Sequence, residues 1–221
     1  MSALQPPQVV VLISGRGGNM RALVERSADP AMGYQVAGVL SDKLEAGGLR
    51  VASDLGIPAR ALVPDAAVPR ADYEAALAAA IDEFTPSLIA LAGFMRILSA
   101  PFVVRYAGRI LNIHPSLLPK YPGLDTHRRA LEAREAQHGA TVHFVTEQLD
   151  AGPPIIQGRI HVEPDDEADS LQARVHVLEH RIYPLAVRWY CTGRLRYSAG
   201  RAWLDGRALS GPVQYDGGEV H

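Results

Sequence analysis

Two polar side chains whose types suit acyl-group chemistry stand one residue apart at the end of an apolar run. Asn112 and His114 open the stretch "NIHPSLLPKYPG", and alternate residues of a strand face the same side. An amide N–H can stabilise an oxyanion, and an imidazole can move a proton at neutral pH. The prolines at 115, 119 and 122 restrict the chain that follows. The spacing therefore favours an acyl-transfer site, although a single histidine near a loop is more often structural.

A carboxylate follows a later apolar run, in the segment Gln148–Gly152. Asp150 could orient an imidazole and stabilise its charged form, which is what a general acid requires. An Asp two residues before a Gly is also ordinary turn chemistry. Asp150 is thus a candidate partner for a histidine, with a turn residue as the alternative.

A glycine-rich loop, Ser14–Asn19, follows the first apolar run and precedes a predicted helix. Glycines let the backbone approach an anion closely, and a helix N-terminus offers free N–H groups. The loop lacks the Gly-Lys-Ser/Thr of a P-loop, and Met20 stands where a dinucleotide fingerprint needs its third glycine. We expect a site for a single phosphate, or else a turn required only for packing.

The stretch from His176 to His180 spells H-x-x-E-H, a pattern found in zinc hydrolases. A zinc site with His176, Glu179 and His180 needs a further protein ligand, and downstream only three acidic residues remain, Asp205, Asp216 and Glu219. A five-residue pattern also arises easily by chance. We expect no metal. The alternative is that the two histidines are structural, either on the surface of a helix or on a packed face of it.

The elements that must position these residues alternate between apolar runs and amphipathic segments, which is typical of a Rossmann-like, doubly wound α/β fold with a mostly parallel sheet and helices on both faces. Ligands bind at the carboxyl ends of the strands in such sheets, and the runs before Gly15, Gly93 and Asn112 should open onto one edge. The predicted strands are Val9–Ser14, Val36–Ser41, Ala59–Val63, Leu88–Ala92, Arg109–Ile113, Thr141–Thr146 and Pro154–Val162. The predicted helices are Asn19–Arg26, Leu44–Leu55, Arg70–Phe84, Ala100–Tyr106, His127–Ala136 and Ala168–Tyr190.

The chain has 221 residues, which suits a single domain. We expect an N-terminal extension over residues 1–8, the domain over 9–209 with a small hairpin near Trp203–Arg207, and a polar, loosely held tail over 210–221. With 48% hydrophobic and 21% charged residues, the composition is that of a soluble globular protein.

Charge and cysteine usage limit the classes of partner and compartment. The net charge is −2 without a basic cluster, which argues against nucleic acid as the main partner. Cys191 is the single cysteine, and neither a signal peptide nor a run of about 20 apolar residues is present. We expect a cytoplasmic protein without a membrane partner, and a homodimer is compatible with this interpretation.

Taken together, the motifs "LISGRGGN", "LAGFMRIL", "NIHPSLLPKYPG", "HGATVHFVTEQLDAGPPIIQ" and "RVHVLEHRIYP" resemble those of the glycinamide ribonucleotide formyltransferases, a folate-dependent family of purine synthesis. The similarity runs from about Val9 to Asp205, in the family's order. The resemblance implies that the amine of glycinamide ribonucleotide attacks the formyl carbon of the co-substrate 10-formyltetrahydrofolate. The products would be formylglycinamide ribonucleotide and tetrahydrofolate.

The resemblance also implies roles for individual residues. Asn112 would hold the oxyanion, His114 would transfer the proton, and Asp150 would work with it. The ribonucleotide would bind through Gly17, Gly18, Asn19 and Glu179, which gives the apparent zinc motif another use. The folate would bind through Arg70, Met95, Arg96, Ile97, Leu98, Asn112, Thr146, Glu147, Gln148, Leu149 and Asp150.

Several positions depart from the family pattern. Arg16 and Gly18 stand where some members carry Asn and Ser, and His176 replaces a Gln. Asp125 stands where some members have His, which leaves His127 as the nearby imidazole. Residues 120–126 are a candidate lid, and a cis Leu118–Pro119 bond is compatible with this turn.

Three alternatives to formyl transfer stay open at this stage. A 10-formyltetrahydrofolate hydrolase (deformylase) would share Asn112 and His114, but would have no use for a phosphate loop. A metal-dependent hydrolase would use His176, Glu179 and His180. A nucleotide-binding sensor would bind both ligands without turnover.

Overall fold

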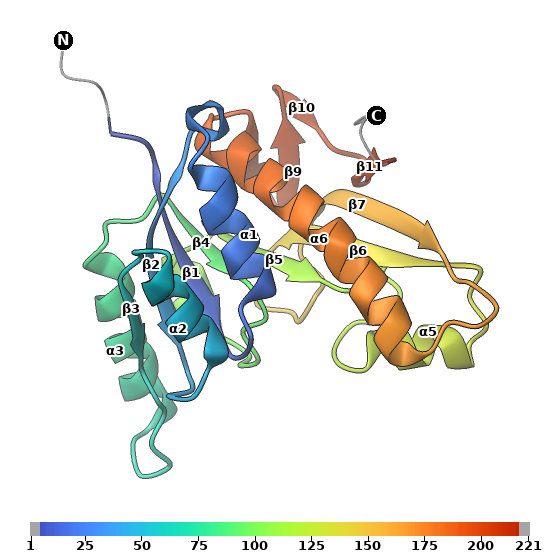
Figure 1. Cartoon of the computed structure of the whole chain (residues 1–221). Coiled ribbons are helices and arrows are strands. Elements are labelled where there is room, and N and C mark those ends of the chain that lie inside the picture. The colour runs from blue at the N-terminus through green and yellow to red at the C-terminus, as the bar shows by residue number, and fades with distance from the viewer. Residues whose placement is uncertain (1–4, 217–221) are drawn as a thin grey trace.

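Eight strands form a central sheet in the order β11-β7-β6-β5-β4-β1-β2-β3, with β3 at the left edge of Figure 1. The computed structural model describes residues 5–216 of the chain. Pairing is parallel except between β5 and β6 and between β6 and β7. The strands are β1 (Gln8–Ile13), β2 (Gln35–Ser41), β3 (Ala59–Ala61), β4 (Leu88–Leu91), β5 (Ile110–His114), β6 (Gln137–Phe144), β7 (Pro154–His161) and β11 (Val213–Tyr215).

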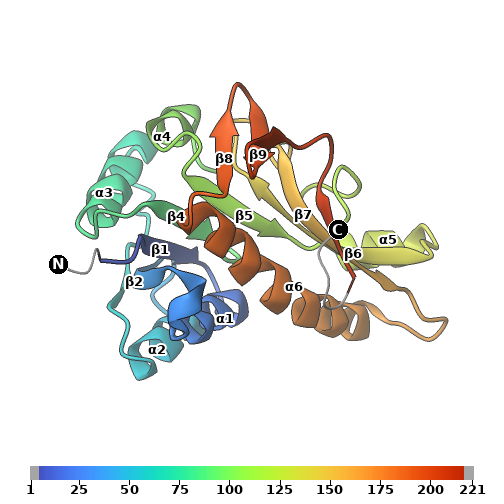
Figure 2. The same ribbon diagram turned by 90° about the horizontal axis from the view of Figure 1, so that it is seen from above.

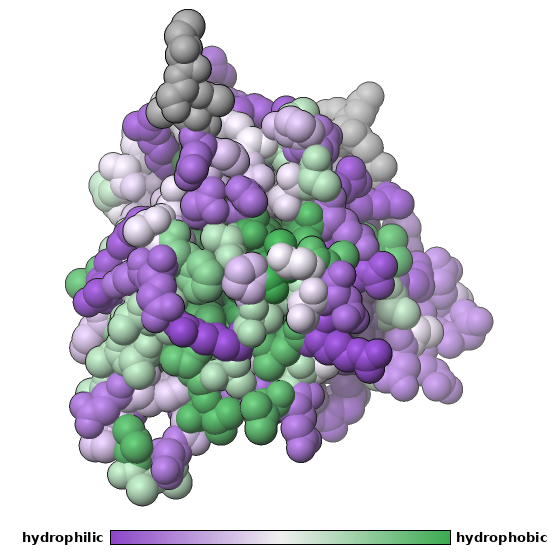
Figure 3. Space-filling model, turned by 60° about the vertical axis from the view of Figure 1, so that its left-hand side comes forward, coloured by the Kyte–Doolittle hydropathy of each residue, from purple (hydrophilic) through white to green (hydrophobic). Residues whose placement is uncertain are grey.

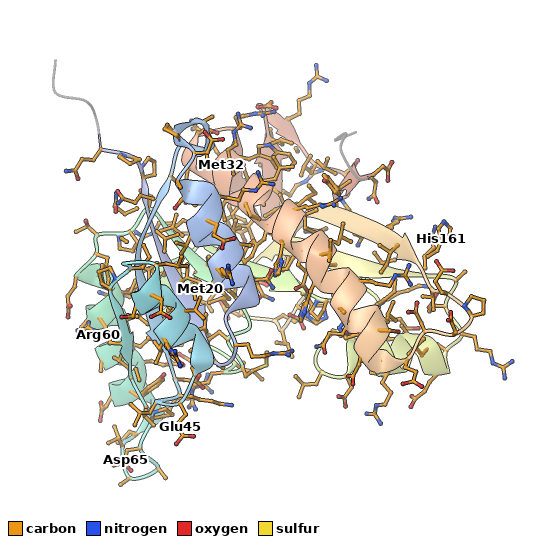
Figure 4. The ribbon with its side chains drawn as sticks, in the orientation of Figure 1. Met20, Met32, Glu45, Arg60, Asp65 and His161 are labelled. Carbon is orange, nitrogen blue, oxygen red and sulfur yellow. The ribbon has the colours of Figure 1, made fainter. Side chains whose placement is uncertain are left out.

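Helices cover both faces of this sheet, so the predicted doubly wound fold is confirmed. In the view from above, α3 and α4 lie on one side of β1 and β4, and α1, α2 and α6 lie on the other (Figure 2). Val9 and Val11 of β1 face the core that contains α1 and α6, whereas Val10 and Leu12 face the core of α3 and α4. Met20 is a fully buried α1 residue of the first core (Figure 4). The helices are α1 (Gly18–Ser27), α2 (Gly47–Asp54), α3 (Arg70–Asp82), α4 (Ala100–Arg105), α5 (Thr126–Glu132) and α6 (Ala168–Cys191), with a 3₁₀ turn, η1, at Pro30–Met32.

Two predicted boundaries differ from the structure for local reasons. β6 begins at Gln137, before the predicted Thr141, because Gly139 pairs closely with β7. A Cβ at Gly139 would lie 2.0 Å from the carbonyl oxygen of Gly158. α5 ends at Glu132 rather than near 136, because Arg134 adopts a left-handed φ of 53° that stops the helix.

The C-terminal region is more ordered than the sequence suggested. The predicted hairpin is present, and it belongs to an antiparallel sheet of β8 (Leu195–Ser198), β9 (Arg201–Leu204) and β10 (Arg207–Ala208). The prediction of a loose tail from residue 210 is wrong for β11, which pairs in parallel with β7 and satisfies its backbone groups there. Residues 1–4 of the predicted extension and 217–221 of the tail lie outside the described part of the chain.

The strand ends that carry the unusual residues meet as expected. β1, β4 and β5 are parallel neighbours, so their carboxyl ends share one edge of the sheet. The Ser14 N–H donates to the carbonyl of Gly93 at 3.0 Å, which ties the first two of these ends together. This edge therefore brings the glycine loop close to the segment after β4 and to the end of β5.

The surface on the side of β3 and α3 carries an area of apolar side chains among polar ones (Figure 3). Exposed apolar residues of the segments around β2, β3 and α3 include Leu44, Val63 and Val68. Within residues 5–216, none of the helices is both long enough and apolar enough to cross a membrane.

Candidate active site

A cavity of about 570 Å³ lies at the carboxyl ends of β4 and β5, beside Asn19 at the start of α1. This volume falls within the range of small-molecule sites, about 300–1,000 Å³. The structure brings most of the predicted site residues together in its wall. Those residues are Asn19, Met95, Arg96, Ile97, Leu98, Asn112, His114, Thr146, Glu147, Gln148, Leu149, Asp150 and Glu179, whereas Gly17, Gly18 and Arg70 lie outside the wall.

His114 and Asp150 form a buried pair at the floor of the cavity. The imidazole Nδ1 lies 3.4 Å from Asp150 Oδ2, and both side chains are 7% exposed. On the other side of the ring, Nε2 lies 2.8 Å from the carbonyl oxygen of Tyr121. The Gly123 N–H donates to Asp150 Oδ2 at 2.8 Å. Both ring nitrogens thus face acceptors, so the surrounding groups fix the orientation of the imidazole.

Asn112 is held by a histidine that the sequence analysis missed. His143 Nδ1 lies 2.9 Å from the carbonyl oxygen of Phe144 and must donate there, so the neutral ring accepts at Nε2. The Asn112 Nδ2 lies 3.1 Å from this Nε2 and donates one N–H to it. Its second N–H is then available to a developing oxyanion. Burial lowers the pKa of His143, which keeps its ring neutral and suited to this acceptor role.

Asp150 lies between the two imidazoles. Its Oδ1 is 3.7 Å from His143 Nε2, while its Oδ2 faces His114. The residue adopts a left-handed φ of 50°, a conformation that is uncommon outside glycine and concentrates at functional sites. The loop of residues 146–150 therefore places one carboxylate against both histidines.

The glycine loop and α6 form the other end of the site. Gly17 has a φ of 78° and is the N-cap residue of α1, so no side chain of that residue covers the first N–H groups of the helix. A Cβ at Gly17 would lie 2.8 Å from Gly48 Cα, and one at Gly18 would lie 3.2 Å from His180 Nε2. The loop thus requires glycine for close packing, which leaves the backbone N–H groups at the helix start.

Glu179 stands beside this loop and is 3% exposed. Burial raises its pKa to about 7, opposed by the hydrogen bond that Asn19 Nδ2 donates to Oε2 at 2.7 Å. The Asn19 Oδ1 is buried and has no hydrogen-bond partner within the described residues. A buried carboxyl and an unpartnered amide oxygen beside free N–H groups fit a polar ligand.

The H-x-x-E-H pattern has a different geometry from that of a zinc site. The rings of His176 and His180 stack in parallel with centroids 6.3 Å apart, and Glu179 turns to Asn19. Throughout the chain from residue 5 to 216, no group of three or more His, Cys, Asp or Glu side chains is placed to hold a metal ion.

The segment after β4 lines the opposite wall. The Met95 N–H donates to Ser14 Oγ at 2.8 Å, and Glu74 accepts from the Ser99 N–H at 3.0 Å. Arg70 donates to Glu74 at 3.0 Å and to the carbonyl of Ile97, so it supports the wall from outside. Met95 and Ile97 are 62% and 61% exposed. These two side chains give this wall an apolar surface against which a flat ligand can pack.

The stretch after His114 lies over the cavity and contains the cis Leu118–Pro119 bond. Asp125, at a position of departure from the family pattern, pairs with Arg128 at 2.6 Å. His127, the other imidazole expected nearby, is buried with its Nδ1 3.1 Å from His138 Nε2. Burial lowers the pKa of each of these two histidines to about 4.

Comparisons with known proteins agree with this geometry. The family described as "Formyl transferase" matches residues 7–187. The chain is 48% identical over 201 residues to the phosphoribosylglycinamide formyltransferase of Escherichia coli K12, covering 91% of this chain and 95% of that protein.

Comparison with solved structures also finds formyltransferases. The phosphoribosylglycinamide formyltransferase of Coxiella burnetii is 44% identical with a TM-score of 0.90, and the match covers 96% of this chain and all of that one. A formyltetrahydrofolate deformylase of Pseudomonas putida KT2440 is 27% identical with a TM-score of 0.81, covering 92% of this chain and 72% of that one. From the extent of these matches, the chain belongs to the formyl transferase family.

Proposed function

We propose that this protein transfers the formyl group of 10-formyltetrahydrofolate to the amine of 5'-phosphoribosylglycinamide, a step of purine synthesis. The observation that carries the proposal is one cavity that joins the Asn112 amide, the His114–Asp150 pair and Asn19, the last residue of the glycine loop. The family and the named relatives support the same reaction.

The residues divide the chemistry as follows. As the amine nitrogen attacks the formyl carbon, Asn112 donates its free N–H to the formyl oxygen, which gains negative charge. His114, paired with Asp150, moves the proton that the attacking nitrogen loses to the folate nitrogen that leaves. The new C–N bond replaces the old one, so the step needs neither oxidant nor reductant.

The two ends of the cavity suit the two substrates. The phosphate of the ribonucleotide would bind to the N–H groups of Gly18 and Asn19 beside Gly17, with Glu179 on the sugar. The pterin would bind at Met95–Leu98, where Arg70 supports the segment, and residues 146–150 would cover it. The proposal includes no metal.

A deformylase would pass the same formyl group to water. The glycine loop with Asn19 and Glu179 favours transfer, because a hydrolase has no use for a ribonucleotide phosphate. The relatives named as formyltransferases also cover nearly the whole chain at higher identity than the deformylase.

The proposal extends to location and partners. We propose a cytoplasmic enzyme whose partners are its two small-molecule substrates, without nucleic acid or membrane, and a homodimer remains a prediction.

The test is to incubate the purified protein with 10-formyltetrahydrofolate labelled in the formyl carbon, with and without glycinamide ribonucleotide. We expect label in the ribonucleotide product and loss of the folate only when the amine is present. Label released as formate at the same rate without the ribonucleotide would support the deformylase instead. Activity lost on exhaustive chelation would support the metal-dependent hydrolase.

A further inference from the structure

A short segment after β5, residues 120–125, binds both members of the catalytic pair through its backbone, and we call it the strap. The Tyr121 carbonyl accepts from His114 Nε2 at 2.8 Å, and the Gly123 N–H donates to Asp150 at 2.8 Å. Backbone groups have fixed directions once φ and ψ are set. The conformation of the strap therefore sets the orientation of the His114 ring and the Asp150 carboxylate.

This conformation is not one that the strap would favour alone. Tyr121 has a left-handed φ of 54°, a conformation that is unfavourable for a residue other than glycine. If Tyr121 returned to negative φ, its carbonyl would turn away from His114. Contacts outside the strap must hold it in place.

Those contacts converge on one carboxylate outside the cavity, that of Glu135. Tyr121 Oη donates to Glu135 Oε1 at 2.8 Å, and Lys120 Nζ donates to its two oxygens at 2.7 and 2.8 Å. Hydrogen bonds from Lys120 and Tyr121 hold the pKa of Glu135 below its usual range, so it is ionised at neutral pH. Glu135 does not line the cavity, and its side chain is 22% exposed.

A second contact reinforces the same geometry. The guanidinium of Arg129 lies over the Tyr121 ring, 5.2 Å from its centroid. This separation is within the reach of a cation–π interaction, about 6 Å. Its Nη1 donates to the carbonyls of Pro122 at 2.7 Å and Leu124 at 3.2 Å. The strap is thus fixed from both sides of Tyr121, and among residues 5–216 Glu135 alone accepts from the Tyr121 hydroxyl.

We propose that Glu135 is a positioning residue for formyl transfer, because it holds Tyr121 and so keeps the strap on His114 and Asp150. The inference rests on the proposed function of that pair. The effect of losing Glu135 should appear in turnover and not in stability, because partly exposed ion pairs contribute little to the free energy of unfolding.

The test compares Glu135→Gln with the wild type in kcat, in KM for both substrates and in thermal denaturation. We expect kcat to fall about tenfold, because small losses of alignment are expensive in catalysis. KM for the ribonucleotide should change less than twofold, since Glu135 does not line the cavity. The loss should therefore fall on kcat and not on KM, a split that a merely structural role would not produce.

Glu83→Gln is the matched control, because Glu83 pairs with Arg60 at 2.9 Å at the β3 edge of the sheet (Figure 4). The control should leave kcat and KM unchanged.

Tyr121→Phe provides a second variant that keeps the Lys120–Glu135 pair and removes one hydrogen bond, in case Glu135→Gln fails to fold. It should lower kcat by a smaller factor and leave KM for the ribonucleotide within twofold of wild type. A kcat of Glu135→Gln within twofold of wild type, or a loss of activity carried by KM and not by kcat, would overturn the positioning role. An inactive wild type would instead refute the proposed function, so the two failures are distinguishable.

Discussion

Glu179→Gln isolates the electrostatic cost of burying a carboxyl at the ribonucleotide end of the cavity. The substitution removes one titrating group and keeps a carbonyl oxygen that can accept from Asn19 Nδ2, which now donates to Oε2 at 2.7 Å. The shape of the side chain is nearly unchanged. The difference in stability between the two proteins should therefore report the ionisation of Glu179.

The sign and size follow from the raised pKa. Burial moves the pKa of Glu179 from 4.5 to about 7, so between these values the folded protein binds more protons than the unfolded chain. The free energy of unfolding contributed by this group then falls as pH rises through that window. A shift of this size corresponds to about 3 kcal/mol, fully expressed above pH 7. The Gln variant should match wild type near pH 4.5 and be about 3 kcal/mol more stable at pH 8.

The assay is urea denaturation of both proteins at intervals from pH 4.5 to 8. His127 and His138 titrate in an overlapping range with the opposite sign, but they are common to both proteins and cancel in the difference. Glu45→Gln is the control, because Glu45 is exposed at the surface (Figure 4). A stability difference between Glu179→Gln and wild type that stays constant across the pH range would show that burial does not raise the pKa of Glu179.

Three further predictions concern other parts of the site. Asp150→Asn should lower kcat by about 10²–10⁴ while the circular dichroism spectrum stays native, and near-normal turnover would remove Asp150 from the mechanism. Gly17→Ala should lower the denaturation midpoint and raise KM for the ribonucleotide, because alanine is strained at the φ of 78° that Gly17 adopts. An unchanged midpoint would show that this position tolerates a side chain. Acidification from pH 6.5 to 4 should destabilise the wild type, because the unfolded chain binds protons that the buried His127 and His138 do not bind in the folded protein. In urea titrations the free energy of unfolding of His138→Gln should depend less strongly on pH, and a pH dependence equal to that of wild type would contradict this role of His138.

The layered sheet could be predicted because its signals are local. The run from Val9 is apolar at every position, which a strand buried on both faces requires, and the two cores divide its residues by alternation. Asn112 and His114 could be found because each stands at the end of such a run. Asp150 could be proposed only through its chemistry, and its placement against His114 depends on a loop whose geometry is not periodic.

The partner of Asn112 could not be found in this way. His143 faces it because β6 pairs antiparallel with β5 in a register that sets these two residues opposite each other. Register depends on contacts between strands distant in sequence, and a shift by one residue would turn His143 to the other face. The strand β11 was missed for a similar reason, since three residues of ordinary composition form a strand only because β7 offers an unpaired edge.

The most direct test of the account is a crystal structure with glycinamide ribonucleotide and a non-reactive folate analogue bound together. We expect the phosphate on the N–H groups of Gly18 and Asn19, the pterin beside Met95–Leu98, and the substrate amine between Asn112 and His114. A phosphate bound elsewhere, or a folate whose reactive nitrogen lies out of reach of His114, would contradict it.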